Sequence, residues 1–508
     1  MAGILGALVG LLGVVFTQPA LPDVPVDPCE SAMIADARRA ISNLKAAAAQ
    51  HGGERTAISA TYEGTLRVEA HMLRPGMTRE IPVTIEVIDD PQSQGLRVRE
   101  TSGQKRSVET TIILGGRVAS QSDADGPFKE LVGEAAQSAA ADAVCWMPWS
   151  ALRAGLAAPS SCRLGPPLTW QGATITPVTC VDRAGRACSV LLDGEHRVGR
   201  IEALAADQRL GDVCAWTSLS DFEQHEGAWV PRKMSRFVVQ PSVTLRYDLS
   251  LTAVHIGSVP PDTFTLPEAR KADIASWGVR SPGAGIEFVA VAPRVWAAEV
   301  AASDSRVLVI ERDHDLVTVG APDGDEVCTA LIAALRERFP DKPIGIATVG
   351  HHHPAPSGGL RAMAATGATI VLPRGLEAYA RWMLSRSTDL GAPAVAFKGE
   401  PRLQLFDGET TIDCGDEQLR LFDIGEKSAH AYHFVVFYLP KAGVLFEDDL
   451  GYFPNNRAAR SNPRLVGLVE AMGGLQIKPT RLIQAWPVRG VLREVPWPDV
   501  EAIVSPAK

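Results

Sequence analysis

The stretch Ile346-Ala-Thr-Val-Gly-His-His-His-Pro-Ala-Pro-Ser-Gly-Gly-Leu-Arg361 runs from β-branched residues into three histidines and then two glycines. This order is typical of a metal-binding loop that follows a strand. Because side chains alternate faces along an extended backbone, we expect His351 and His353 to point the same way and His352 the other. Two such imidazoles can share one cation, and neutral imidazole suits zinc. A His-x-His spacing alone also fits an ordinary polar loop.

Other segments place this stretch in a known pattern. It resembles the metal-binding loop of the metallo-β-lactamase superfamily, whose motif reads His-x-His-x-Asp-His before a Gly-Gly pair. Residues 428–440 are similar to the strand pair that carries a third histidine, here His430, and residues 444–450 to the segment with a metal-bridging aspartate, here Asp449. The resemblance covers residues 285–508 and implies an αββα sandwich, with two sheets between layers of helices.

Three positions depart from the family's pattern. Ala355 and Pro356 stand where the motif has its aspartate and following histidine, and Trp486 stands where the family supplies a last histidine. The resemblance therefore implies that a second metal site is lost and that one zinc ion remains. The expected metal ligands are His351, His353, His430 and Asp449.

In the family the missing aspartate also orients the attacking water. Catalysis by a general base raises the reaction rate by about 10² to 10⁴, so its loss would slow a hydrolase. Asp449 is the expected catalytic residue, and Glu447, Asp448 and His433 are further candidates for this help. Each has a plain alternative. Glu447 and Asp448 also fit solvated turn residues, and His433 also fits a hydrogen-bonded histidine on a strand.

The first half of the chain has a different pattern of apolar and polar residues. A helix is expected over residues 30–51 and helices again over the Ala-rich residues 127–158. Period-two patterns predict antiparallel strands with one wet face, at residues 58–69, 80–87, 95–101, 106–114, 187–192, 198–205, 214–222, 228–240 and 242–256. The order resembles the curved half-barrel of periplasmic lipoprotein-carrier proteins, whose concave face can hold an apolar ligand. A packing module that stabilises its neighbour is the alternative.

These patterns predict an α+β chain of 508 residues with several domains. We expect a signal-like or anchor segment at residues 1–22, an antiparallel β half-barrel domain with a helical insertion at 30–267, a linker at 268–284, and a metallo-β-lactamase-like domain at 285–508. The net charge of −9 argues against nucleic-acid binding, which needs a basic face.

Residues 1–22 carry no charged side chain, which favours export to the periplasm or cell envelope, with membrane anchoring through this segment as an alternative. Eight cysteines include five between positions 145 and 214, and none forms a Cys-x-x-Cys motif. An oxidising compartment would allow disulfides such as Cys162 with Cys180 or Cys188 with Cys214. Buried thiols that act as small apolar residues are the alternative.

Two functions remain open from the sequence. The first is an exported hydrolase of the metallo-β-lactamase superfamily that cleaves an ester or amide bond of a small-molecule or lipid-like substrate by attack of zinc-activated hydroxide. The second is a catalytically degenerate envelope protein that uses the fold to bind a ligand or partner. The three histidines favour the hydrolase, whereas Ala355, Pro356 and Trp486 favour the degenerate relative.

Overall fold

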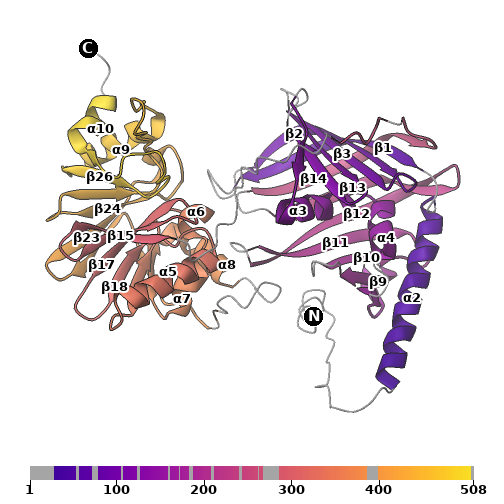
Figure 1. The fold of residues 1–508 in the computed structure, drawn as a ribbon, viewed down its shortest axis with the longest axis horizontal. Helices are drawn as coiled ribbons and strands as arrows, with labels where there is room; N and C mark the ends of the chain where they lie inside the picture. The colour runs from indigo at the N-terminus through magenta and orange to yellow at the C-terminus, as the bar shows by residue number, and fades with distance from the viewer. Residues whose placement is uncertain are drawn as a thin grey trace. The chain divides into compact units, whose positions relative to one another are not determined.

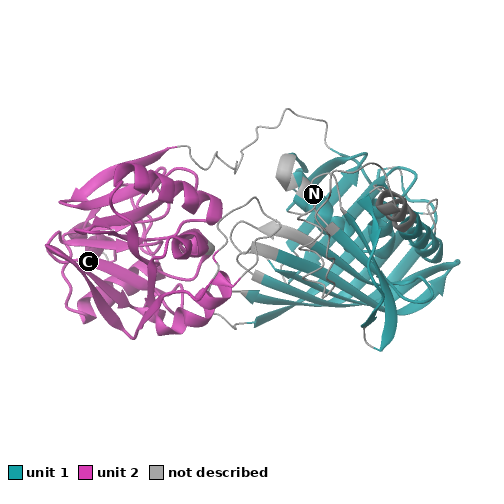
Figure 2. Cartoon of the chain, turned by 90° about the horizontal axis from the view of Figure 1, so that it is seen from below, with its two compact units in different colours: residues 1–69, 78–205, 213–275 teal, residues 70–77, 206–212, 276–508 magenta. Residues whose placement is uncertain are grey.

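The computed structural model divides the chain into two compact units (Figure 2): unit 1, residues 1–69, 78–205 and 213–275, and unit 2, residues 70–77, 206–212 and 276–508. The structure describes residues 28–52, 57–70, 78–103, 107–122, 126–157, 161–170, 172–181, 187–207, 211–239, 243–260, 262–266, 285–385, 397 and 399–504. The expected export segment, residues 1–22, and the expected linker, residues 268–284, lie outside the described residues. None of the helices in the described ranges combines the length and the apolar character that a membrane crossing requires.

Unit 1 is built on one 14-stranded sheet, with strands in the order β6-β5-β4-β3-β2-β1-β14-β13-β12-β11-β10-β9-β7 and β8 paired to β9. Its helices are α2 (Pro28–Gln50), α3 (Gly133–Val144) and α4 (Pro148–Ala157). Its strands are β1 (Ile58–Ala70), β2 (Thr78–Asp90), β3 (Gly95–Ser102), β4 (Ser107–Leu114), β5 (Arg117–Gln121), β6 (Lys129–Leu131), β7 (Arg163–Leu164), β8 (Leu168–Trp170), β9 (Ala173–Val181), β10 (Ala187–Leu192), β11 (Val198–Asp207), β12 (Gly211–His225), β13 (Ala228–Val239) and β14 (Val243–Ile256).

One face of this sheet packs against a hydrophobic core. Along β2, Val83, Ile85 and Val87 are buried and alternate with more exposed residues, which is the pattern of a strand with one face on a core. They share that core with Leu44 of α2, Ala143 of α3 and Leu152 of α4. The three helices therefore cover the apolar face of the sheet.

Unit 2 contains two sheets. The first has seven strands in chain order: β15 (Ile286–Ala292), β16 (Val295–Val300), β17 (Ser305–Glu311), β18 (Leu316–Val319), β19 (Ile344–Thr348), β20 (Thr369–Pro373) and β21 (Leu403–Phe406). The second has six: β22 (Glu409–Cys414), β23 (Glu417–Asp423), β24 (Val435–Leu439), β25 (Val444–Glu447), β26 (Arg481–Gln484) and β27 (Val495–Pro496). The helices are α5 (Asp325–Arg338), α6 (Pro354–Ser357), α7 (Leu360–Ala365), α8 (Glu377–Leu384), α9 (Pro463–Gly474) and α10 (Trp497–Val504), with 3-10 turns η2 (Arg374–Leu376) and η3 (Gly425–Ser428).

Strand β17 shows how these elements form layers. Val307 and Val309 pack with the helices α5, α7 and α8. The alternate residues Leu308 and Ile310 pack with the second sheet, through residues such as Phe437. A third core joins the outer face of the second sheet to α9 and α10. Unit 2 thus has four layers: helices, sheet, sheet, helices (Figure 1).

The expected α+β class is confirmed, and every strand predicted in the first half coincides with an observed strand. The expected helix at residues 30–51 is α2, and the Ala-rich region forms α3 and α4. The prediction missed β5, β6, β7, β8 and β9, and it was wrong for β6, which lies within the residues expected to form helices. Strand β5 is only five residues long, and β9 contains Pro177, a residue that argues against a strand because it has no N–H to donate.

Candidate metal centre

The three histidines lie at the carboxyl end of β19. Strand β19 ends at Thr348, and residues 351–353 form bends before α6 begins at Pro354. The expectation of an extended backbone through the histidines is therefore wrong, because Pro354 starts a helical turn directly after them. All three imidazoles are nevertheless buried.

A close approach of two segments shapes this end of the strand. The carbonyl of Gly350 accepts a 2.6 Å hydrogen bond from the N–H of Val435, the first residue of β24. A Cβ atom on Gly350 would overlap the carboxylate of Asp448. Gly350 is needed here because only a residue without a side chain lets the ends of the two sheets meet.

His430 comes from the second sheet's side of the site. It lies in the loop between η3 and β24, so its expected place in a strand pair is wrong. Ala429 adopts the left-handed conformation, with φ of 50°, and the Ser428 hydroxyl accepts hydrogen bonds from the N–H groups of His430 and Ala431, both at 3.1 Å. These local bonds hold the turn that presents His430.

Asp449 is delivered by the turn after β25. In that turn the Glu447 carboxylate accepts a 2.6 Å hydrogen bond from the N–H of Leu450. The backbone carbonyl of Asp449 accepts a 3.4 Å bond from Arg464 in the first turn of α9, and the Arg464 guanidinium lies 3.5 Å from an Asp449 carboxylate oxygen. The aspartate is therefore held from both sides.

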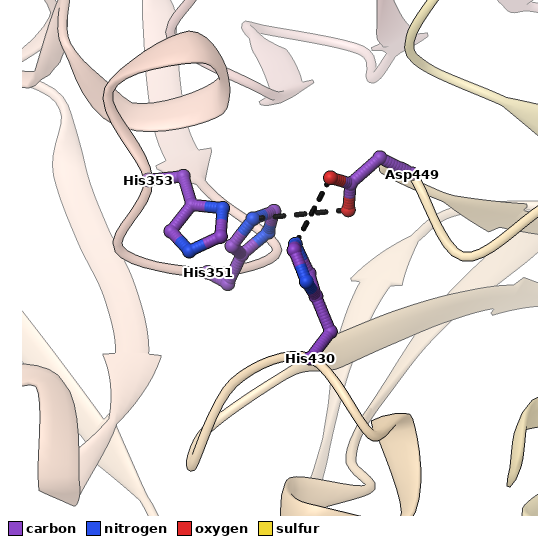
Figure 3. Close-up of side chains that lie close together, drawn as sticks. All are labelled: His351, His353, His430 and Asp449. Atoms are coloured by element: carbon purple, nitrogen blue, oxygen red, sulfur yellow. Dashed lines mark ion pairs between the residues drawn. The ribbon is translucent and has the colours of Figure 1, made fainter. Parts of the chain in front are cut away.

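The structure brings the four expected ligand residues together (Figure 3). His351, His353, His430 and Asp449 each offer one ligand atom, and these atoms lie within 4.8 Å of one another. The three ring centroids are 4.2 to 5.0 Å apart in pairs. Asp449 Oδ2 lies 2.9 Å from His430 Nε2, and Asp449 Oδ1 lies 3.8 Å from His351 Nε2.

The donor atoms of this cluster fit a bound cation. His351 Nε2 and Asp449 Oδ1 are buried, and neither makes a hydrogen bond to a residue that the structure describes. Buried polar atoms without such bonds cost free energy unless a further group binds them. Three imidazoles suit zinc in a four-coordinate geometry that leaves one position open, and the Asp449 carboxylate lies beside them.

The protonation states of His351 and Asp449 also favour a bound cation. Burial lowers the pKa of His351 to about 3, so its ring is neutral at pH 7, as a metal ligand must be. Burial alone would raise the pKa of Asp449, but the neighbouring imidazoles, His351 foremost, lower it overall. The cluster thus contains the neutral ring of His351 and the ionised carboxylate of Asp449.

Asp448 supports the cluster without joining it. Its Oδ2 lies 2.8 Å from His351 Nδ1, and both side chains are buried. When Nδ1 carries the proton and donates it to this carboxylate, Nε2 keeps its lone pair and faces the ligand atoms. The alternative of a solvated turn residue at Asp448 is wrong, because this carboxylate is buried. Its expected part in catalysis stays a prediction.

The other expected residues lie outside the ligand cluster. Glu447 is fully buried, which contradicts a solvated turn. Burial raises its pKa well above the usual value. His433 Nδ1 lies 2.6 Å from the Asp423 carboxylate, so it is hydrogen-bonded, although it precedes β24 and is not on a strand. The backbone N–H of Trp486 donates to the Asp448 carbonyl at 2.8 Å, and its side chain is 42% exposed, so the indole does not fill the site.

Ala355 and Pro356 form part of α6, and their carbonyls accept backbone hydrogen bonds from Asp323 and Ala321. They offer no side-chain ligand atom. The position of Arg464 beside Asp449 was not predicted, although Asn462-Pro463 is a sequence signal for the start of a helix here. The Asn462 side chain accepts the N–H groups of Arg464 and Leu465, as a helix N-cap does, and so places Arg464 in the first turn of α9.

No known protein family and no curated protein sequence matches the chain. Among solved structures, a metallo-beta-lactamase from Pontibacter korlensis is 17% identical with a TM-score of 0.33, and the match covers 43% of this chain and 97% of that chain. The metallo-beta-lactamase FIM-1 from Pseudomonas aeruginosa in its mono-zinc form is 18% identical with a TM-score of 0.31, over 43% of this chain and 93% of that chain. TM-scores this low assign neither a fold nor an activity.

Proposed function

We propose that unit 2 is a hydrolase of the metallo-β-lactamase type that uses one zinc ion to cleave an ester or amide bond of a small-molecule or lipid-like substrate. The observation that carries this proposal is the buried cluster of His351, His353, His430 and Asp449, whose donor atoms converge while two of them lack a hydrogen bond to a described residue. The four-layer arrangement of helices and sheets supports the superfamily. Ala355, Pro356 and Trp486 provide no further ligand atom of the family's kind, which supports a single ion.

Each residue has a separate part in this proposal. The three imidazoles hold the ion, which when bound lowers the pKa of water to about 7 and polarises a carbonyl. Asp449, with a side chain that is 17% exposed, is the cluster member nearest to solvent. Its carboxylate can orient a water molecule and accept its proton, while Arg464 keeps the carboxylate in place.

The experiment is a hydrolysis assay with the zinc-loaded full chain and 4-nitrophenyl acetate, butyrate and decanoate, together with a chromogenic amide. We expect turnover that Asp449→Asn lowers by about 10² to 10⁴ in kcat/KM, the usual contribution of a general base. His433→Ala is the matched control and leaves kcat/KM unchanged, because His433 pairs with Asp423 outside the cluster.

The alternative is a catalytically degenerate protein that keeps the fold and the metal but does not hydrolyse a substrate. It is favoured by the loss of the motif's second-half ligands at Ala355 and Pro356. A wild-type chain that holds one zinc and turns over no substrate faster than an equal concentration of zinc salt would establish this alternative and reject the hydrolase.

A second candidate function belongs to unit 1. A cavity of about 560 Å³ lies there, lined by apolar side chains such as Leu96, Ile113 and Leu156 and by Asp89, Ser150 and Arg153. Its volume lies within the roughly 300 to 1,000 Å³ of small-molecule sites. We infer that it holds an apolar or lipid-like ligand, as the half-barrel resemblance implies.

This second function is tested with N-phenyl-1-naphthylamine, an uncharged fluorescent probe of apolar sites. We expect saturable binding to the full chain that Leu156→Trp abolishes by filling the cavity. Val132→Trp is the control, since Val132 is 50% exposed and is not among the lining residues. Equal binding by wild type and Leu156→Trp would reject this site.

We also propose that the chain is exported to the periplasm or cell envelope, with residues 1–22 as the signal or membrane anchor. The disulfide between Cys162 and Cys180 supports an oxidising compartment. Fractionation of cells that express the full chain tests this. Recovery in the cytoplasmic fraction with both cysteines reduced would contradict it.

A further inference from the structure

Four cysteines of unit 1 lie next to one another in space. Strand β9 pairs with β10 so that Cys180 lies directly opposite Cys188. Strand β7 pairs with β9 through Arg163 and Thr179, which puts Cys162, the residue before Arg163, beside Cys180 on the other side. Cys162 and Cys180 form a disulfide. The sequence-based pairing of Cys188 with Cys214 is wrong, since neither is in a disulfide.

Cys180 and Cys188 point to the same face of the sheet. Directly opposite residues of an antiparallel pair share a face, with Cβ atoms about 4.5 to 5.5 Å apart. Both cysteines contact the buried core of unit 1, while the next pair, Thr179 and Ser189, meets on the opposite face through a 2.7 Å hydroxyl contact. The sulfur of Cys188 therefore lies next to the disulfide.

Cys145 completes the row from the helical layer. It is the C-cap of α3, it is buried, and its thiol is hydrogen-bonded to the side chain of Cys188. The guanidinium of Arg236, itself buried, donates to the Cys145 carbonyl at 3.3 Å. The bond from Cys188, with help from Arg236 and against the effect of burial, lowers the pKa of Cys145. The positive charge of Arg236 next to Cys145 favours its thiolate.

We propose that Cys145, Cys188, Cys180 and Cys162 form a thiol–disulfide relay that moves the disulfide from Cys162–Cys180 to Cys145–Cys188. In the first step Cys188 gives its proton to the Cys145 thiolate as its sulfur attacks the sulfur of Cys180. The Cys188–Cys180 bond forms, the Cys180–Cys162 bond breaks, and Cys162 leaves with the electron pair as a thiolate.

In the second step the sulfur of Cys145 attacks Cys188. The Cys145–Cys188 bond forms, Cys180 leaves, and the proton of Cys145 passes to the departing sulfur. One disulfide, one thiol and one thiolate are present before and after, so the exchange needs no external oxidant. The disulfide thus moves from Cys162–Cys180, at the β7 end of the sheet, to Cys145–Cys188, which would link the C-cap of α3 to β10.

The test is a disulfide map of the full chain, incubated without oxygen at pH 8, quenched in acid, unfolded, labelled with N-ethylmaleimide and digested without reductant. We expect Cys145–Cys188 peptides together with Cys162–Cys180 peptides, in a ratio that becomes constant with time. Of the eight cysteines, two remain in one disulfide, so six take the label in every chain. Oxidation by a contaminant would instead leave four labelled.

Serine variants test the part of each thiol in the first step. Cys188→Ser removes the Cys145–Cys188 peptide completely and keeps Cys162–Cys180. Cys145→Ser removes the thiolate that accepts the proton of Cys188, so this variant also keeps Cys162–Cys180 and forms no Cys180–Cys188 peptide. Cys214→Ser is the matched control and gives the wild-type map, since burial raises the pKa of Cys214 to about 12 and keeps this thiol unreactive.

Two results would overturn the relay. One is a wild-type chain that retains only Cys162–Cys180, with Cys145 and Cys188 fully labelled after prolonged incubation. The other is a Cys145→Ser chain in which Cys162 takes the label, which would show that Cys188 attacks the disulfide without the Cys145 thiolate. The wild-type map does not depend on the folding of any variant, so it decides the question by itself.

Discussion

His351 and Asp448 form a buried pair in which Nδ1 of the imidazole lies 2.8 Å from a carboxylate oxygen. The two residues are 97 positions apart in the chain. They can approach each other because Gly350 has no Cβ atom, which would overlap the Asp448 carboxylate. A carboxylate behind a ligand histidine fixes the ring's orientation and raises the basicity of the nitrogen that faces the metal. The pair therefore links the two sheets of unit 2 to the properties of the proposed metal centre.

Asp448→Ala is expected to lower zinc affinity by about 10 to 100-fold, the usual cost of losing such a support. Competition with a chromophoric chelator measures this. His433→Ala, which removes another histidine–carboxylate pair but leaves Asp423 in place, is the control and keeps wild-type affinity. If Asp448→Ala bound zinc as tightly as wild type, His351 would not need this carboxylate.

Two glycines of α9 offer a matched pair of substitutions. A Cβ at Gly467 would overlap the carbonyl oxygen of Lys427 in η3, the turn that leads to His430, whereas a Cβ at Gly473 meets open space. We expect Gly467→Ala to destabilise the chain by about 1 to 3 kcal/mol through overpacking and to weaken zinc binding. Gly473→Ala should stabilise it by up to about 1 kcal/mol, since alanine suits a helix better than glycine. Urea unfolding distinguishes them, and equal stabilities would contradict the close packing of α9 on η3.

The stability of unit 1 is expected to depend on pH through Asp89. Burial raises its pKa to about 6 from an ordinary 3.8, although Arg153 and Ser150 act against this. The folded state thus holds the proton more tightly, so this contribution is fully present below pH 4 and is lost as pH rises through 6. The shift corresponds to about 3 kcal/mol.

Urea unfolding between pH 4 and 7 checks this slope. The difference in stability between wild type and Asp89→Asn should change across the window, because asparagine does not titrate. Glu63→Gln, at an exposed position of β1, is the control and should keep the wild-type slope. A difference that stays constant with pH would show that Asp89 is ionised throughout.

Zinc should stabilise unit 2 measurably. A ligand that binds only the folded state at 100 times its Kd adds about 2.7 kcal/mol, which raises Tm by roughly 5 to 10 °C for a domain of this size. Differential scanning calorimetry with and without a chelator measures the shift. An unchanged Tm at saturating zinc would mean that the cluster does not bind the ion in the folded state.

Much of the fold follows from periodicity. Strands such as β2 and β14 alternate apolar and polar residues, and the helix α2 is bounded by recognisable breaks, so their positions could be predicted. The convergence of His351 and His430 could be expected only from a resemblance, because nothing local in residues 425–434 shows which way that loop turns. Its course depends on the left-handed Ala429 and on the packing of Gly467.

The parts that could not be predicted depend on contacts between distant segments. The support of His351 by Asp448 requires the loop after β19 to meet the loop after β25. The row of cysteines requires the exact register of β7, β9 and β10, and a shift of one residue would turn Cys188 to the other face. Spacing in the sequence carries neither relationship.

The most direct test of the metal centre is the zinc content of the purified full chain, measured by mass spectrometry of the metal beside His353→Ala and His433→Ala. We predict one zinc per chain in wild type and in His433→Ala, and loss of that zinc in His353→Ala. Of the two substituted histidines, His353 belongs to the converging cluster and His433 does not. Equal zinc in all three proteins, or none in wild type after dialysis against zinc, would contradict the proposed centre.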